Sequence, residues 1–334
     1  MYLYPDLNTF EILPWRPQHG KVARFMCDVY RPEGVPFEGD SRYVLKNVLK
    51  KAAKMGYTFD VGPECEFFLF HTDDNGQPTN ITHEKASYFD VTPLDLGENA
   101  RRDIVLTLES MGFEIEASHH EVAPAQHELA PIYAPVNIAA DHNQIMMRIL
   151  KKVASRHGMR CLLHEKPFAG LNGSGKHNNW SLTSDDGVNL LNPGDTPHEN
   201  IQFLLVLACI LKAVDTHADL LRESAADIGN DHRLGANEAP PAIISVFLGE
   251  QLEDVIAQLC STGEATHSKS GGTLKTGVAT LPDLDKDATD RNRTSPFAFT
   301  GNKFEFRMVG SSDSIAPANV VLNTIVAEAF KEAA

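Results

Sequence analysis

Cysteine is scarce in this chain, and its few cysteines lie far apart. The 334 residues include five, none of them in a Cys-x-x-Cys pair, at positions 27, 65, 161, 209 and 260. This number and spacing argue against a disulfide framework and against a zinc site built from thiolates.

Positive charge and long apolar runs are also lacking. The 30 Lys and Arg are outnumbered by 45 Asp and Glu, and the net charge of −15 disfavours nucleic-acid binding, because phosphates require a basic surface. The longest apolar stretch, residues 203–211, is too short to cross a membrane, and the first six residues do not resemble a signal peptide. The composition therefore predicts a soluble cytoplasmic protein with no membrane or nucleic-acid partner.

Helical periodicity alternates with short strand-like runs along the chain. Helices are predicted over residues 41–55, 98–111, 136–157, 199–226, 250–260 and 315–333. Strands are predicted over residues 20–29, 59–70, 113–118, 126–133, 159–164, 176–182, 242–248 and 303–309. This order indicates a mixed α/β or α+β fold. Residues 262–296 are predicted to form a long loop that leaves the main body of the fold.

Two glutamates lie two positions apart in the strand-like run of residues 62–70. Alternate residues of a strand share a face, so Glu64 and Glu66 point the same way, and Cys65 and its alternates point the other way. Two such carboxylates repel each other unless a positive group lies between them. Taken alone, this run fits a solvated edge strand and a binding site equally well.

Two other segments repeat this arrangement. Glu121 and Glu128 flank a turn that contains proline. In residues 303–308 the apolar alternate positions are expected in the core, and the opposite face carries Lys303, Glu305 and Arg307. Strand faces that are merely solvated should carry charges of scattered sign. The same arrangement in three distant segments therefore favours a binding site.

A turn with two glycines precedes another short strand. Residues 172–181 read Asn-Gly-Ser-Gly-Lys-His-Asn-Asn-Trp-Ser, and glycine lets the backbone approach a ligand closely. His177 can supply an imidazole to a metal ion, although a lone histidine is more often structural. The polar positions Asn179 and Ser181 on the same strand favour a site.

Arginine completes the set of charged groups. Arg233, Arg291 and Arg293 lie in polar loops, where each one alone is as well explained by solvation. Carboxylates and one histidine suit hard cations, and arginines bind phosphate or carboxylate. The combination suggests metal-assisted phosphoryl transfer.

Taken together and in order, these motifs resemble those of glutamine synthetase. The matching segments are residues 62–68, 121–128, 172–177, 233–240, 292–293 and 304–307. Any one of them could arise by chance, but six in the family's order are specific. The part up to about residue 128 resembles type I enzymes, and the rest resembles type III enzymes, with Asn179 and Ala298 replacing a histidine and an arginine of type I.

The resemblance implies an α+β fold of the glutamine synthetase catalytic (guanido kinase-like) type. A mainly antiparallel curved sheet, flanked by helices, would form a funnel-shaped site. Residues 1–30 would be the remnant of the N-terminal β-grasp domain, and residues 31–334 a catalytic domain shortened at its C-terminal end. The β-grasp loop that supplies an aspartate to a neighbouring subunit would be missing.

The resemblance also implies two divalent cations, Mg²⁺ or Mn²⁺, in each site. The first would be held by Glu66, Glu121 and Glu128. The second, against the ATP phosphates, would be held by Glu64, His177 and Glu305.

Substrate contacts follow from the same resemblance. Asn172, Gly173, Arg233 and Arg307 resemble the residues that hold glutamate, and Tyr88 would lie near the ammonium pocket. Lys303 and Arg293 resemble basic residues that contact phosphate. Ser181 and Asn179 fall on positions at the nucleotide side of the site. Glu238 resembles a carboxylate on a flap that closes over the site. Glu238, Arg293 and Arg233 are the expected catalytic residues.

The implied reaction joins ammonia to the γ-carboxylate of L-glutamate. ATP would phosphorylate that carboxylate, and ammonia would then displace phosphate from γ-glutamyl phosphate to give glutamine, in a homo-oligomeric ring. Three alternatives remain: a γ-glutamyl ligase for another amine, a non-catalytic protein of this fold, and a truncated gene product.

Overall fold

A nine-stranded sheet organises the chain in the computed structural model, which describes residues 1–15, 20–79, 86–269 and 295–334, with short pieces between residues 272 and 285. Its strand order is β11 (Val246–Phe247), β14 (Phe297–Phe299), β15 (Phe304–Phe306), β10 (Lys176–Ser184), β5 (Tyr57–His71), β7 (Gln126–Pro131) and β6 (Ile115–His120). Two further strands, β8 (Ala134–Pro135) and β9 (Met159–Leu162), also pair with β5. Among the described strands of this sheet, all pairs are antiparallel except β11 with β14.

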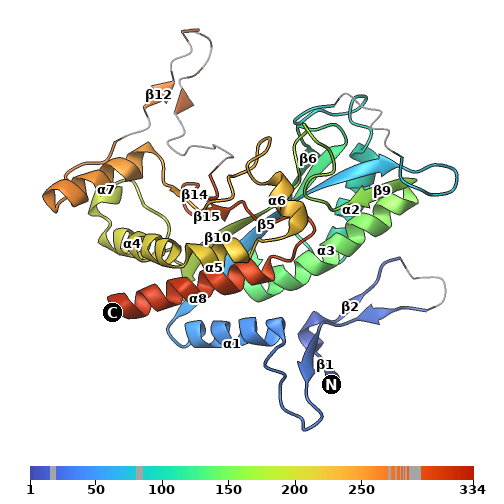
Figure 1. The fold of residues 1–334 in the computed structure, drawn as a ribbon, viewed down its shortest axis with the longest axis horizontal. Helices are drawn as coiled ribbons and strands as arrows, with labels where there is room; N and C mark the ends of the chain where they lie inside the picture. Colours follow the sequence, from blue (N-terminus) through green and yellow to red (C-terminus); the bar gives the residue numbers. More distant parts are fainter. Residues whose placement is uncertain are drawn as a thin grey trace.

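Helices cover the sheet and complete the α+β class predicted from the sequence. They are α1 (Ser41–Ala53), α2 (Glu98–Glu109), α3 (Val136–Arg156), α4 (Ile201–Thr216), α5 (Ala218–Glu223), α6 (Ile228–Arg233), α7 (Glu250–Thr262) and α8 (Ala316–Ala333). Figure 1 shows α1, α3 and α8 along one side of the sheet. None of the helices in the described part of the chain is long and apolar enough to cross a membrane.

Some element boundaries differ from the sequence-based prediction. The predicted helix 199–226 is two helices, α4 and α5, which meet at His217, and α6 was not predicted. The predicted strand 242–248 shrinks to β11. Much of the predicted excursion 262–296 lies outside the described residues, apart from the end of α7, the pair β12 (Thr273–Leu274) and β13 (Leu284–Asp285), and a few other positions.

Strand alternation places the core below the sheet. Cys65, Phe67 and Leu69 of β5 pack against α2 and α3 in one apolar cluster. A larger cluster joins Trp180 of β10 and Phe304 of β15 to α4 and α8. Both clusters match the apolar faces predicted from the two-residue period.

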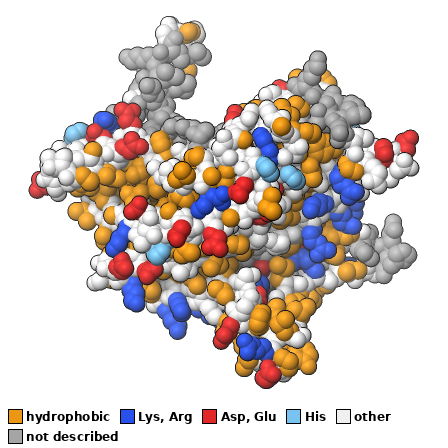
Figure 2. Space-filling model, in the orientation of Figure 1, with side chains coloured by type: hydrophobic (Ala, Val, Ile, Leu, Met, Phe, Trp, Pro, Cys, Tyr) orange, Lys and Arg blue, Asp and Glu red, His pale blue; other side chains and the backbone are white. Residues whose placement is uncertain are grey.

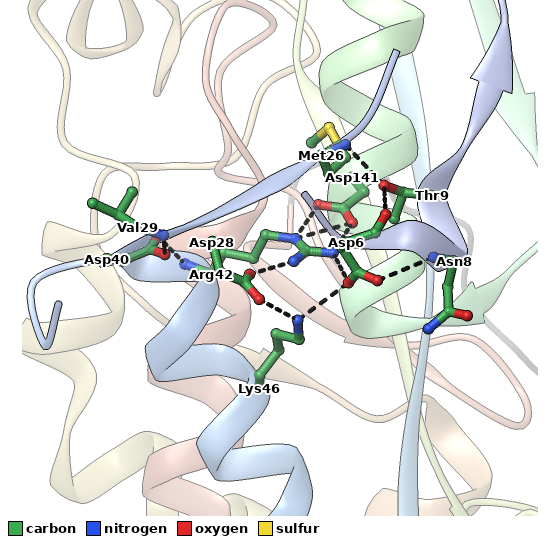
Figure 3. A network of polar contacts seen from close by, with 10 residues as sticks. All are labelled: Asp6, Asn8, Thr9, Met26, Asp28, Val29, Asp40, Arg42, Lys46 and Asp141. Carbon is green, nitrogen blue, oxygen red and sulfur yellow. Dashed lines mark hydrogen bonds and ion pairs between the residues drawn. The ribbon is translucent and has the colours of Figure 1, made fainter. Parts of the chain in front are cut away.

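The first 30 residues form two small sheets, and a charged network ties them to the helices. β1 (Tyr2–Pro5) pairs with β4 (Cys27–Tyr30), and β2 (Glu11–Ile12) pairs with β3 (Ala23–Arg24). Arg42 of α1 lies 2.8 Å from Asp6 and 2.8 Å from Asp141 of α3, and it also pairs with Asp28 (Figure 3). The network therefore holds the N-terminal segment against two helices at once.

The N-terminal segment also carries exposed apolar side chains. Figure 2 shows hydrophobic groups gathered on the surface where β1 lies in Figure 1, and the exposed ones include Tyr2, Leu3, Leu7 and Phe10. The assignment of residues 1–30 to a separate domain stays a prediction.

Candidate active site

A cavity of about 530 Å³ opens above β5, β6, β7, β10 and β15. Its lining contains all six predicted metal ligands, Glu64, Glu66, Glu121, Glu128, His177 and Glu305. The sheet therefore brings together side chains from four distant parts of the sequence. Within the cavity they form two groups.

The group predicted to hold the second cation is assembled by strand register. His177 of β10 is the direct partner of Glu64 of β5, and Glu305 of β15 faces the next cavity-side position of β10, Asn179. The Nδ1 atom of His177 lies 3.0 Å from Glu305 Oε1 and 3.4 Å from Glu64 Oε2. One ligand atom from each of these three residues lies within 4.8 Å of the other two. This spacing permits a single ion to contact all three.

Neighbouring side chains fix the orientation of these two carboxylates. The Asn179 amide donates to Glu64 Oε1 at 2.7 Å, and Arg307 Nη2 donates to Glu305 Oε2 at 2.7 Å. Burial opposes protonation of His177, but hydrogen bonds to Glu305 and Glu64 outweigh it and raise the pKa of His177 well above its ordinary value.

The other group lies one strand further along the sheet. Glu66 of β5 and Glu128 of β7 are direct partners, and Glu128 is also the partner of His119 in β6. The Nε2 atom of His119 lies 3.0 Å from Glu121 Oε1 and 3.0 Å from Glu128 Oε2. Glu66 accepts a hydrogen bond of 2.6 Å from the Gly175 backbone N–H. Glu121 and Glu128 thus form a close group with His119, one ligand atom of each lying within 4.8 Å of the others. Glu66 lies opposite Glu128, and its predicted share in this metal site stays a prediction.

Burial and mutual repulsion raise the pKa of two acids of this group. Burial, reinforced by repulsion from Glu64, Glu66 and Glu121, raises the pKa of Glu128 to about 8. Burial also raises the pKa of Glu66. Burial opposes protonation of His119, but its bonds to Glu121 and Glu128 raise its pKa to about 9. Such a donor set favours a cation that neutralises the carboxylates together.

His119 was missed by reasoning from the sequence. Two aromatic rings hold it: Phe89 stacks on it at 4.4 Å between ring centroids, and Tyr88 meets it edge-on at 5.5 Å. Its position two residues before Glu121 was the available signal, because positions i and i+2 of a strand share a face. Tyr88 lines the cavity beside this group, and its place near an ammonium pocket stays a prediction.

A family model now identifies the chain. The model described as glutamine synthetase, catalytic domain, matches residues 38–224, more than half of the sequence. The chain belongs to the glutamine synthetase family.

Relatives with this family name are numerous and similar. The chain is 58% identical to a type-3 glutamine synthetase of Dictyostelium discoideum over 221 residues, which are 66% of this chain and 30% of that protein. It is 47% identical to a glutamine synthetase of Bacteroides fragilis (strain YCH46) over 363 aligned residues, covering 97% of this chain and 49% of the relative. The chain thus spans half or less of the length of these curated relatives.

Solved structures confirm the glutamine synthetase fold predicted from the sequence. A GmaS complex with ADP superposes with a TM-score of 0.74 at 23% identity, covering 99% of this chain and 67% of that one. A Plasmodium falciparum glutamine synthetase studied by cryo-electron microscopy gives a TM-score of 0.73 at 18% identity, covering 99% of this chain and 63% of that one.

Further residues that the sequence assigned to substrate binding line the same cavity. They are Asn179 and Ser181 of β10 and Lys303 and Arg307 beside β15. The exposed side chain of Tyr133, which the sequence did not single out, lines it as well. Polar and aromatic groups therefore extend from the second acidic group along one wall. Arg291 and Arg293 lie outside the described residues.

Arg233 lies beneath the cavity and does not line it. Its side chain is 2% exposed, and its Nη2 atom donates to the Arg307 carbonyl at 2.9 Å. An added Cβ at Gly175 would lie 2.2 Å from that Nη2 atom, so the guanidinium passes directly under this glycine. A Cβ added at Gly173 would likewise lie 2.2 Å from the carbonyl oxygen of Glu165. These contacts give both glycines of the 172–177 motif a packing role.

Glu238 contacts a residue that the sequence assigned to glutamate binding. Asn172 donates its side-chain amide to Glu238 Oε2 at 2.6 Å, outside the lining of the cavity. Glu238 has a φ of 48°, a left-handed conformation that is unfavourable for residues other than glycine. Strained backbone of this kind is often found at functional loops.

Proposed function

We propose that this chain catalyses the ATP-dependent ligation of ammonia to the γ-carboxylate of L-glutamate, giving glutamine, ADP and phosphate. The observation that supports it most is that all six predicted metal ligands line one cavity. Glu64, His177 and Glu305 form one close group in it, and Glu121 and Glu128 form another with His119. Membership of the glutamine synthetase family supports the same reaction.

The donors of the cavity suit hard divalent cations, Mg²⁺ or Mn²⁺. Glu66, Glu121 and Glu128 would hold one ion, and Glu64, His177 and Glu305 the other. Carboxylates with a single imidazole, and no thiolate, are the ligands that such ions prefer. When bound, the ions neutralise the carboxylate and phosphate charges that would otherwise keep two anions apart.

The chain's own residues would bind and orient the two substrates. Arg307, at the cavity wall beside Glu305, would pair with a carboxylate of glutamate. Asn172 and Gly173 would lie at the edge of that subsite. Arg233 is buried beneath Gly175 and donates to the Arg307 carbonyl, so it would support the subsite from below without lining the cavity.

ATP would lie along the wall that carries Lys303, Ser181 and Asn179, with Arg293 contacting phosphate. In this arrangement the γ-carboxylate of glutamate attacks the γ-phosphorus, the bond to the β-phosphate oxygen breaks, ADP leaves and an acyl phosphate forms.

Ammonium would enter near Tyr88, beside the carboxylates of the first group. Ammonium would pass a proton to a carboxylate of this group or to water, and the resulting ammonia would displace phosphate from the acyl carbon. Glu238, on a strained turn next to Asn172, would close the site and keep water from the intermediate.

Assembly and location complete the proposal. We place the chain in a cytoplasmic homo-oligomeric ring, with residues 1–30 as part of a β-grasp domain and residues 31–334 as the catalytic domain. The charged network of Arg42 supports docking of the two parts.

A coupled assay of glutamine and ADP formation tests this function. The chain is incubated with glutamate, ATP and ammonium, with Mg²⁺ or with Mn²⁺, and in parallel with methylamine in place of ammonium. We expect ADP release that depends on metal, glutamate and ammonium together. A folded, metal-loaded sample without glutamate-dependent ADP release would overturn the function, and a preference for methylamine would replace ammonia by another amine.

A further inference from the structure

A buried polar cluster lies beneath the first group of acids. It consists of Asp95, Arg101, His120 and His127, whose exposed fractions are 0%, 7%, 0% and 1%. Four polar or charged side chains buried together require internal partners, because each loses its contacts with water.

The contacts within the cluster start at α2. Arg101 forms an ion pair with Asp95, and its Nη1 atom lies 3.1 Å from His127 Nδ1. A guanidinium only donates hydrogen bonds, so His127 Nδ1 accepts, and the neutral ring carries its proton on Nε2. Arg101 therefore fixes both the tautomer and the plane of the His127 ring.

The cluster then reaches the backbone of the site. His120 is the direct strand partner of His127, and their rings meet edge-on at 4.8 Å between centroids. His120 Nδ1 lies 2.5 Å from the carbonyl oxygen of Glu121. A carbonyl oxygen only accepts, so this ring donates to the main chain of a proposed metal ligand.

Each histidine immediately precedes a proposed ligand in the sequence. His120 precedes Glu121, and His127 precedes Glu128. Adjacent residues of a strand point to opposite faces, so a ring held below Glu128 sets the backbone from which that carboxylate rises. Groups that hold metal-binding side chains in this way commonly tune metal affinity.

The cluster itself does not resemble an independent metal site. Asp95, His120 and His127 have ligand atoms within 4.8 Å of one another, a spacing that would admit an ion. However, Arg101 already supplies a positive charge to Asp95. A Cβ added at Gly97 would lie 2.5 Å from His127 Nε2, so the backbone at Gly97 covers this second ring nitrogen.

We propose that Arg101, His127 and His120 are positioning residues that orient Glu128 and Glu121 toward the first cation. This inference rests on the proposed function, because it assumes that the first group of acids binds metal. It adds a role for three buried residues that do not touch a substrate.

Mn²⁺ binding by the full chain, followed by electron paramagnetic resonance, tests the proposal. The key pair is His127→Leu, which removes the acceptor for Arg101, and His127→Asn, whose side-chain oxygen can occupy the Nδ1 position. His120→Leu and His120→Asn form a second pair, in which the Asn amide can replace the donor to Glu121. Asn323→Ala is the control, because it removes a buried 2.8 Å hydrogen bond to Trp180 beneath β10, away from this cluster.

We expect the Leu variants to weaken one of two Mn²⁺ sites by roughly 10- to 100-fold and the Asn variants to stay within about threefold of wild type. Asn323→Ala should lower the thermal unfolding temperature and leave both sites intact. If the Leu variants do not fold, His127→Gln takes their place, because its longer amide does not reach the Nδ1 position, and it should bind more weakly than His127→Asn.

Two results overturn different claims. Wild-type protein that binds no Mn²⁺ overturns the metal site and this inference with it. Wild-type binding that is unchanged in the Leu and Gln variants, or that falls equally in the Asn variants, overturns only the positioning role.

Discussion

Glu66 and Glu128 face each other directly across the β5–β7 ladder. Like charges at directly opposed positions destabilise a pair of strands, and here burial adds to the cost. The pKa of Glu128 is accordingly raised to about 8, first by burial and then by the neighbouring acids. A cation bound between the two carboxylates would offset this cost, and the proposed first metal site depends on it.

Glu305→Gln should abolish the reaction without unfolding the protein. Glu305 contacts His177 at 3.0 Å and Arg307 at 2.7 Å, so removing its charge removes one ligand and the partner of a guanidinium. We expect at least about a hundredfold loss of turnover and weaker Mn²⁺ binding at one site. Steady-state assays measure the turnover and circular dichroism checks the fold, with Glu332→Gln at an exposed position as the control. Wild-type turnover in Glu305→Gln would contradict the assignment of Glu305 to the site.

Arg307→Ala should act mainly on glutamate. Its guanidinium lies in the cavity wall and is held by Glu305, a geometry suited to a substrate carboxylate. We expect the apparent KM for glutamate to rise by roughly 10- to 100-fold, with a smaller change in the KM for ATP. Arg307→Lys keeps the positive charge but loses the planar guanidinium. Its KM for glutamate should therefore lie between those of wild type and Arg307→Ala. An unchanged KM for glutamate would contradict the assignment.

Glu238→Gly should separate stability from activity. Glycine adopts the observed φ of 48° without strain, so the free energy of unfolding should be unchanged or higher by up to about 1 kcal/mol. Turnover should fall because the carboxylate is lost. Glu238→Ala loses the same carboxylate and keeps the strain, so it should be the less stable of the two by urea unfolding. Full turnover in both variants would exclude a role for this carboxylate.

Asp6→Asn should change the response of the fold to acid. The hydrogen bond from Arg42 lowers the pKa of Asp6 to about 2, although burial acts in the opposite direction. A carboxyl group whose pKa is lowered by folding stabilises the fold at pH values above its ordinary pKa of 3.8. This stabilisation is lost as the pH falls toward 2.

Urea unfolding between pH 2 and pH 7 measures this effect. We expect Asp6→Asn to be less stable by about 1 kcal/mol at pH 7 and to lose less stability than wild type between pH 4 and pH 2. The exposed Asp195→Asn is the control. Parallel pH profiles for wild type and Asp6→Asn would contradict the role of the Arg42 network.

Strand periodicity was sufficient to predict which acids share a face. Glu64 and Glu66, and separately Lys303, Glu305 and Arg307, line the cavity as expected, because alternation along a strand is a local property. The family resemblance then predicted that these separate segments meet, which periodicity alone does not reveal.

Long-range contacts created the features that the sequence did not reveal. His119 meets Glu128 through the β6–β7 register and meets the ring of Phe89 from a distant segment, and Arg233 donates to the segment that follows β15. The junction of α4 and α5 at His217 has no glycine or proline to mark it. In each case the deciding neighbour is distant in the sequence or leaves no local signal.

Anomalous diffraction from crystals grown with MnCl₂ tests the central claim most directly. We expect two manganese peaks in the cavity, one among Glu66, Glu121 and Glu128 and one among Glu64, His177 and Glu305. Crystals saturated with Mn²⁺ that show no peak among either set of side chains would contradict it.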